Sequence, residues 1–437
     1  MVPLEEILAR LDRALASSPA DETELVWIEA RRGQESNGKH RRDSYEAPER
    51  TVLVRVREAG RIGQHRTHAA GASDLENAIR DALGQARLAR PEEPAERIGG
   101  TAAPPTLPGL ADPEIARIAQ GRARDLVQQH AGRGEVGWLG WAEGRQAVVT
   151  SRGLRCATEA TAAWLVASCG RSAGAGRAAA AARSLAGVDL AAVFERARSR
   201  HAAPGPVADP PTRPVPLILS PEAAAALLDL LNREALGSAT FRYGAFRTRL
   251  GEQVAPPLFT LRDEPLGGTV PGLPFPFDVL GAAKRATVLI DGGILRTPAV
   301  DAGLAAGLGL PPTAHLVTPE EALATHLVLA PGETPEEEIL RRAEGGLWVT
   351  WLDRPRAFDP AALRFRGWLR GVRRLENGAL GAPVPDLLWE DHLPSLLLRV
   401  TAVGNTPVTA VATGDPLFGA TTAPLLAFAD VDLTPRS

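Results

Sequence analysis

Cysteine is scarce in this sequence of 437 residues, which contains only Cys156 and Cys169. Two cysteines exclude a disulfide framework, and they also exclude a zinc site made of four thiolates. We interpret both residues as small buried or half-buried side chains on neighbouring strands.

Long apolar runs and an excess of positive charge are also absent. No apolar run approaches the length of about 18 residues that a membrane helix needs, and the start lacks the basic-then-apolar order of a signal peptide. We therefore expect a cytoplasmic protein without a membrane contact. The net charge of −3 gives no general attraction to nucleic acid. Lysine is rare, since Lys39 and Lys284 are the only two.

What remains is the composition of a folded protein, with 44% hydrophobic and 23% charged residues. The length favours two domains. A proline-rich run at 201–214 excludes a regular element and marks the boundary, so we predict an N-terminal α+β domain over 1–200 and a C-terminal β-rich domain over 215–437. The predicted fold class is α+β, with mixed or antiparallel sheets and flanking helices.

The N-terminal half alternates between helical and strand periodicity. Apolar spacing predicts helices over 3–17, 73–90 (with Asp74 as N-cap) and 114–132, and strands over 24–30, 51–57, 136–141, 145–151 and 161–168. Residues 174–179 match the pattern G-x-G-x-x-A, and we expect them to open an alanine-rich helix. We reject dinucleotide binding because the flanking strands form a meander rather than βαβ units.

A helix is predicted from Ser220 to about Leu236, with Ser220 as N-cap and Gly237 as a left-handed stop. Leu227, Leu228 and Leu231 form one apolar stripe, by which we expect the helix to pack.

The last turn of this helix reads Arg233-Glu234-Ala235-Leu236-Gly237-Ser238. It resembles the His-Glu-x-x-x-His zinc helix of the TldD/TldE (PmbA) metalloprotease family. Further motifs of that family follow in order: Asp263-Glu264-Pro265, Phe277-Asp278 with Leu280 in place of a Glu, a hairpin over 287–295, Glu376-Asn377-Gly378 and Val403-Gly404-Asn405.

The resemblance places this chain on the branch of the family whose members lack the zinc ligands. Arg233 and Ser238 stand at the two histidine positions, and no cysteine follows Cys169 to provide the third ligand of the catalytic members. A guanidinium stays protonated and a neutral hydroxyl is a poor zinc ligand. We expect no cofactor in this chain and interpret the other histidines, among them His315 and His326, as ordinary surface residues.

The resemblance implies the non-catalytic subunit of a TldD/TldE-type heterodimer that cleaves unfolded or small peptides. A TldD-type partner would supply zinc and the general-base Glu. Arg233, Glu234 and Ser238 would face the enclosed chamber without binding metal. Two alternatives stay open: a homodimeric peptide-binding or scaffold protein, and an independent hydrolase that uses Glu234.

A run of arginines offers a second candidate site. If residues 364–374 form one strand, Arg364, Arg366, Arg370 and Arg374 lie on one face. Such a face is either solvated or binds carboxylates of a peptide or an acidic partner, because arginine pairs with carboxylates through two hydrogen bonds.

Overall fold

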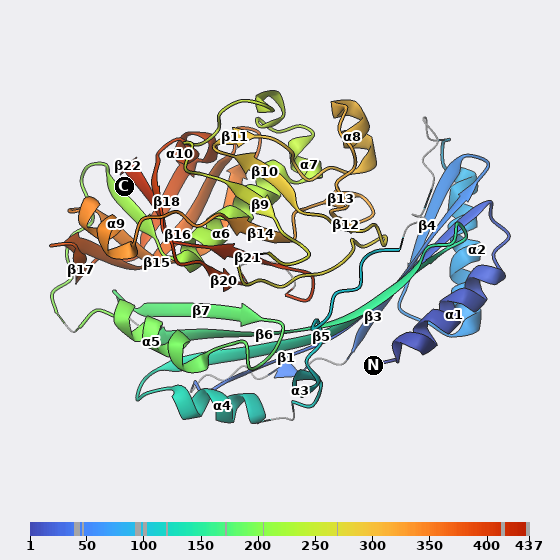
Figure 1. The fold of residues 1–437 in the computed structure, drawn as a ribbon, viewed down its shortest axis with the longest axis horizontal. Coiled ribbons are helices and arrows are strands. Elements are labelled where there is room, and N and C mark those ends of the chain that lie inside the picture. The colour runs from blue at the N-terminus through green and yellow to red at the C-terminus, as the bar shows by residue number, and fades with distance from the viewer. Residues whose placement is uncertain are drawn as a thin grey trace.

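The computed structural model describes residues 1–38, 44–45, 48–91, 98, 103–118, 121–170, 173–203, 205–268, 270–411 and 416–433. Within these ranges the chain forms an α+β fold, as the sequence predicts. A long curved sheet from the N-terminal half lies beneath the C-terminal half (Figure 1).

The N-terminal sheet is antiparallel throughout, in the order β4-β3-β1-β5-β6-β7, with β2 paired to β1. Its strands are β1 (Glu22–Ser36), β2 (Ser44–Tyr45), β3 (Glu49–Glu58), β4 (Arg61–Thr67), β5 (Val136–Thr150), β6 (Arg155–Cys169) and β7 (Gly176–Ala182). The central strands β1, β5 and β6 are each 15 residues long. This length lets one end of the sheet extend past the C-terminal half (Figure 1).

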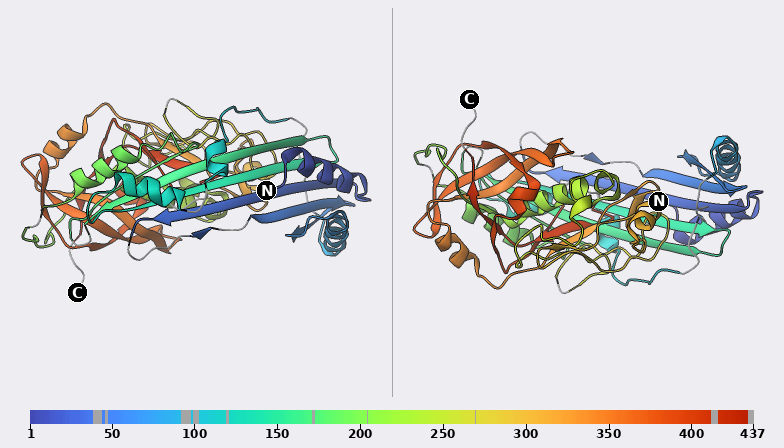
Figure 2. Two further views of the ribbon diagram at one scale, coloured as in Figure 1. Left: turned by 90° about the horizontal axis from the view of Figure 1, so that it is seen from below. Right: turned by 90° about the horizontal axis from the view of Figure 1, so that it is seen from above.

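The helices that the structure describes in this half are α1 (Leu4–Ala16), α2 (Ala72–Leu88), α3 (Pro113–Ala116), α4 (Arg122–His130) and α5 (Leu190–Arg200). Helices α1 and α2 bury Ile7, Leu11 and Ile79 against the extended end of the sheet. Helices α3, α4 and α5 cover the other end, where Val127 and Phe194 are fully buried (Figure 2). The predicted helices over 3–17 and 73–90 are confirmed as α1 and α2. The single helix predicted over 114–132 is wrong, because α3 ends at Ala116 and α4 begins only at Arg122, after Gly121 with φ +88°.

Several local predictions in this half are wrong. Residues 136–150 form one strand, not two. The alanine-rich segment is strand β7 and not a helix, because residues 178–182 pair one by one with residues 163–167 of β6 in an antiparallel ladder. Asp74 is not the N-cap of α2; it lies one turn inside, and its carboxylate accepts from Gly71 N at 2.9 Å. Cys156 and Cys169 lie at opposite ends of the same strand, β6, rather than on neighbouring strands.

The described residues of the C-terminal half form a six-stranded sheet, a seven-stranded sheet and a small hairpin. The first sheet has the order β11-β10-β9-β14-β21-β20, the second β17-β16-β15-β8-β22-β19 with β18 paired to β16, and β12 pairs with β13. The strands are β8 (Val215–Leu219), β9 (Leu261–Asp263), β10 (Thr287–Asp291), β11 (Ile294–Leu295), β12 (Leu316–Thr318), β13 (Glu321–Ala322), β14 (His326–Leu329), β15 (Leu347–Asp359), β16 (Arg364–Glu376), β17 (Ala379–Pro383), β18 (Leu387–His392), β19 (Val400–Val403), β20 (Val408–Ala410), β21 (Ala420–Ala423) and β22 (Leu426–Val431).

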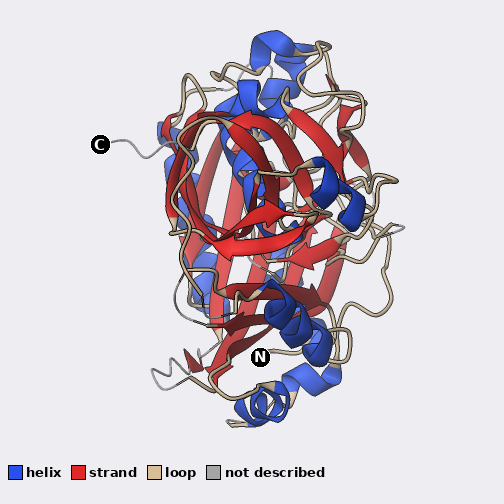
Figure 3. Cartoon of the chain, turned by 90° about the vertical axis from the view of Figure 1, so that its left-hand side faces the viewer, coloured by secondary structure: helices blue, strands red, loops and turns tan. Residues whose placement is uncertain are grey.

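These strands curve around a central helix, α6 (Pro221–Leu231), as the end-on view shows (Figure 3). The smaller helices of this half are η1 (Asn232–Leu236), α7 (Ser238–Phe241), η2 (Arg247–Arg249), α8 (Ala302–Leu308), α9 (Glu336–Arg342) and α10 (Leu393–Leu397). The predicted hairpin at 287–295 is confirmed. The Asn377-Gly378 motif forms the turn between β16 and β17, and both of its residues have positive φ.

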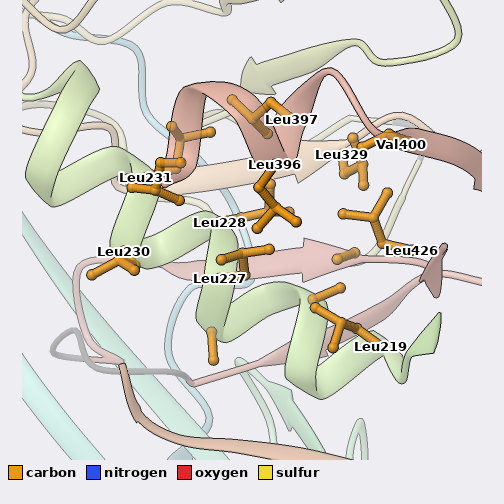
Figure 4. Packing of buried hydrophobic residues seen from close by; sticks show 14 of the residues in the cluster. Leu219, Leu227, Leu228, Leu230, Leu231, Leu329, Leu396, Leu397, Val400 and Leu426 are labelled. Carbon is orange, nitrogen blue, oxygen red and sulfur yellow. The ribbon is translucent and has the colours of Figure 1, made fainter. Parts of the chain in front are cut away.

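Helix α6 is buried on nearly every side, so the prediction of one packing stripe is too narrow. Of its eleven residues only Asp229 is not buried. Leu227 and Leu228 pack toward the strands and α10, while Leu230 and Leu231 lie on other sides of the helix (Figure 4). Four small alanines in succession, 223–226, let neighbouring strands approach the first turns from all directions. A helix that is apolar all round belongs inside a core.

The two halves are joined by buried polar contacts. Between 201 and 214 no helix or strand occurs among the described residues, which omit Pro204. The boundary of two domains at this segment stays a prediction. Across it, Arg200 Nη1 donates to Glu222 Oε2 at 2.8 Å, and Gln146 Nε2 donates to the carbonyl of Asp278 at 2.9 Å. Arg183 donates to the carbonyls of Leu273 and Pro274.

Candidate functional site

The segment that follows α6 is a single π-helical turn, η1. Its wider hydrogen bond runs from Gly237 N to Asn232 O at 2.7 Å, five residues apart. Gly237 has φ −73° and ψ 151°, which is extended backbone, so the predicted left-handed stop is wrong. A Cβ at this position would lie 2.4 Å from Leu323 Cδ2, so a larger residue would have to displace the end of that side chain. Isolated π turns occur frequently at functional sites.

Arg233 is held on the helix surface by carboxylates of its own helix. Its Nε donates to Asp229 Oδ2 at 3.1 Å, and its Nη1 lies 3.9 Å from Glu234 Oε1. Burial raises the pKa of Asp229, and the nearby charge of Arg233 opposes that rise. The guanidinium is therefore the counter-ion of a half-buried acid.

Ser238 has no exposed surface, and its hydroxyl is already engaged. The Oγ accepts from Ala322 N at 2.8 Å. One turn earlier, the Asn232 side chain donates to Ala324 O at 2.8 Å and accepts from Ala324 N at 3.3 Å. Asn232 and Ser238 together fasten η1 and α7 to the segment between β13 and β14.

These residues do not fit a zinc ion. Arg233 cannot lose its proton, and Ser238 has its oxygen committed to a backbone N–H. Among Arg233, Glu234 and Ser238, only Glu234 carries a carboxylate. Across the described ranges, no group of three or more His, Cys, Asp or Glu side chains is arranged to hold a metal.

A cavity of about 390 Å³ lies between the N-terminal sheet and η1. Ile28 of β1 and Gln146 of β5 form its floor, and β12 and β21 contribute Leu316 and Thr421. Of the three residues predicted to face a chamber, Arg233 lines this cavity, whereas Glu234 and Ser238 are not among its lining residues. The other lining residues are Asp229, Asn232, Phe277, Asp278, Val279, Lys284, Val317, Leu323, Ala324, Thr325, Val411, Phe418, Gly419 and Ala420.

Next to the cavity lies a buried cluster of charged side chains that sequence reasoning missed. His315 Nε2 lies 2.8 Å from Asp263 Oδ2, and both side chains are almost completely buried. Asp263 Oδ1 accepts from His326 N at 2.6 Å. Burial favours the neutral form of Asp263, but the charge and hydrogen bond of His315, the charge of Lys284 and the N–H of His326 together outweigh it, so the pKa of Asp263 is lowered.

The prediction that His315 and His326 are surface residues is wrong, because each is only 1% exposed. Burial lowers the pKa of His326 to about 4. Their positions in a loop and on a short strand gave no sign of burial, since the enclosing segments are far away in the sequence. The Asp263 motif was the one signal present, and it identified the acid but not its partners.

Two further charges belong to this region. The Lys284 ammonium donates to Thr325 Oγ1 at 2.6 Å, and burial lowers its pKa. Asp278 accepts through Oδ1 from Leu280 N and Ala282 N, each at 3.0 Å. Burial raises the pKa of Asp278, and these backbone donors oppose the rise.

The arginine run does form one strand, β16, but its four arginines do not share a face. Leu369 and Val372, three residues apart, both pack in the main core, so the alternation changes phase at Gly371, which has φ +61°. Arg374 therefore leaves the face that carries the other three.

Each arginine of the run has a partner within the chain. Arg370 Nη1 lies 2.6 Å from Asp386 Oδ2, and Arg366 Nη2 lies 3.4 Å from Glu390 Oε1. Arg364 lies over the ring of Phe358, and Arg374 donates to the carbonyl of Asp209. These contacts favour the simpler of the two interpretations, a partly solvated face that satisfies its own charges.

Comparison with known proteins places the chain in a family. Residues 212–434 match the family model described as the PmbA/TldA metallopeptidase C-terminal domain. Because that match spans half of the chain, the protein belongs to the PmbA/TldD metallopeptidase family. No curated protein matches the chain in sequence.

Solved structures share the fold over the whole chain. TldE from Thermococcus kodakarensis is 20% identical with a TM-score of 0.80, covering 98% of this chain and 99% of its own. A proposed modulator of a DNA gyrase from Thermotoga maritima is 18% identical with a TM-score of 0.80, and the match covers 98% of this chain and 100% of that protein. A protein of similar description from Bacteroides thetaiotaomicron is 19% identical with a TM-score of 0.77, covering 100% of both. In the described part of this chain, no helix is long and apolar enough to cross a membrane.

Proposed function

We propose that this chain is the non-catalytic subunit of a TldD/TldE-type zinc metallopeptidase that acts on unfolded or small peptides. The observation that carries the proposal is the state of the helix end after α6. The family fold is retained, while both histidine positions hold residues that cannot bind zinc and that have partners of their own, Arg233 with Asp229 and Ser238 with Ala322.

In this proposal the zinc and the general base come from a TldD-type partner chain. Arg233, Glu234 and Ser238 keep the helix end in its distorted shape, and Arg233 is the one of them beside the cavity. A peptide in extended form would be held by backbone pairing to a free strand edge, which selects unfolded chains without reading their sequence.

The test uses the purified chain alone, a TldD-type protein from the same genome alone, and the two mixed. We expect the chain alone to be free of stoichiometric zinc by mass spectrometry and inert toward an unfolded casein substrate. We expect the mixture to elute as a 1:1 complex in size-exclusion chromatography with light scattering and to cleave the substrate. Glu234→Gln in this chain is the matched control, and it should leave cleavage by the complex within a factor of about two, because the catalytic base belongs to the partner.

Other results would support the rival functions. Stable homodimers that bind peptides and ignore the TldD-type protein would favour a self-contained scaffold. Zinc-dependent cleavage by the chain alone, lost in Glu234→Gln, would establish an independent hydrolase and overturn the proposal.

A further inference from the structure

The cavity beside η1 has the size and lining of a small-molecule site. Ligand pockets in proteins measure roughly 300–1,000 Å³ and are mainly apolar, with a few polar groups that orient the ligand. This cavity measures about 390 Å³, and its apolar wall includes Phe277, Phe418, Leu316 and Leu323. The polar groups are few and come from separate elements.

Lys284 is the buried cation on this wall, and its hydrogen bonds are incomplete. Its side chain is 5% exposed, and an ammonium carries three donors. Among the residues that the structure describes, Thr325 Oγ1 is its one hydrogen-bond acceptor, at 2.6 Å. In the same described ranges no carboxylate comes within 4 Å of the ammonium. A buried charge without a paired counter-ion is costly.

The nearby acids are already occupied. Asp278 Oδ1 accepts two backbone N–H groups and its Oδ2 accepts a third, from Leu316 at 3.3 Å. Asp263 holds His315 and the backbone of His326. Asp229, the other acid on the wall, is paired with Arg233 at 3.1 Å. An anion in the cavity would therefore meet acids that are paired or hydrogen-bonded, together with an ammonium whose one acceptor among the described residues is Thr325 Oγ1.

We propose that this cavity binds an apolar monocarboxylate, and that the Lys284 ammonium recognises the carboxylate. The aromatic wall takes the apolar body of the ligand. A phosphate would need more donors than one buried ammonium supplies, whereas a carboxylate accepts the two that remain free. The same chemistry is offered by a free apolar acid and by the C-terminal end of a short peptide. The proposal does not depend on a catalytic partner.

The experiment is isothermal titration of the purified chain alone with matched probes. N-acetyl-phenylalanine carries the carboxylate, and its neutral amide keeps the same body. 3-Phenylpropionate represents a free acid, and the dipeptide Ala-Phe represents a peptide end. We expect both carboxylate classes to bind and the amide to bind at least about tenfold more weakly, because it cannot form the charged hydrogen bond.

Variants identify the residue. Lys284→Met keeps the length of the side chain and should abolish the preference for acid over amide, while leaving the thermal midpoint unchanged or higher. Arg285→Met is the matched control, because Arg285 is exposed, lies next in sequence and does not line the cavity. It removes the same charge and should leave the preference intact.

Equal affinity for acid and amide would overturn the proposal, as would a preference that survives Lys284→Met or that Arg285→Met removes. Failure of all four probes to bind at millimolar concentration would overturn it as well. Binding of the dipeptide alone would identify the C-terminal end of a peptide as the source of the carboxylate. Binding of the free acids alone would identify a free apolar acid. Should Lys284→Met fail to fold, the comparison of acid with amide on the unchanged protein still tests the proposal.

Discussion

The buried pair of Arg200 and Glu222 joins the two halves of the chain, and its loss should be the most damaging single change at that junction. Glu222 opens α6 and its side chain is fully buried, while the Arg200 side chain at the end of α5 is 8% exposed. Glu222 Oε2 accepts from Arg200 Nη1 at 2.8 Å, and Oε1 accepts from Ala179 N at 3.0 Å.

Removing one member of such a pair leaves the other charge buried and unpaired, which costs about 3–5 kcal/mol. We therefore expect Glu222→Ala to lower the free energy of unfolding by about that amount. Glu222→Gln should cost less, because its amide oxygen can still accept from Ala179. Replacing both partners, as Arg200→Met with Glu222→Leu, should recover much of the loss, since an apolar pair of similar volume needs no counter-ion.

Urea unfolding followed by tryptophan fluorescence measures these differences, because Trp348 lies beside the guanidinium of Arg200. The matched control is Glu6→Ala, which breaks the exposed pair with Arg10 and should cost less than about 0.5 kcal/mol. A loss below about 1 kcal/mol for Glu222→Ala would refute the reasoning, and so would a double variant less stable than either single one.

Three further predictions concern the site. Ser238→His should destabilise the protein by several kcal/mol, because it overpacks the core and removes the acceptor of the Ala322 N–H. Arg233→His should cost about 1 kcal/mol or less. Similar urea midpoints for the two variants would contradict the buried position of Ser238. Burial lowers the pKa of His326 to about 4, below its unfolded value of 6.5, so its contribution to stability is complete above pH 6.5 and is lost as the pH falls toward 4. That loss is about 3 kcal/mol, so His326→Gln should flatten the plot of the free energy of unfolding against pH between pH 7 and 4. An unchanged slope of this plot would contradict the prediction. Burial raises the pKa of Cys156 to about 12, so about one thiol in 10⁴ is ionised at pH 8, and Cys156 should react with a thiol reagent far more slowly than the unfolded chain, an expectation that equal rates would disprove.

Periodicity in the sequence was sufficient for the elements that have one apolar face. Helices α1 and α2 could be predicted because their apolar spacing reflects a core on one side and solvent on the other. Strands β1 and β3 could be predicted from their short apolar runs, which the structure buries on both faces of the sheet. Alanine-rich β7 could not, because alanine favours a helix locally and only the ladder with β6 makes the segment a strand. Strand β5 was predicted as two strands because the polar stretch at Glu143-Gly144 resembles a turn, although Gly144 lies inside the ladder and makes room for Leu417, whose Cδ1 would lie 2.7 Å from an added Cβ.

The sequence by itself determined the family resemblance and the loss of the zinc ligands, since residue identity at Arg233 and Ser238 decides what those side chains can bind. Only the tertiary structure decided which charged residues meet beside the cavity. Asp263, Lys284, His315 and His326 are distant in the sequence and carry no common pattern, and they meet because β9 pairs with β14 while the 277–284 loop closes over them. Burial and pairing of charges depend on neighbours that folding brings together, so they cannot be read from local sequence.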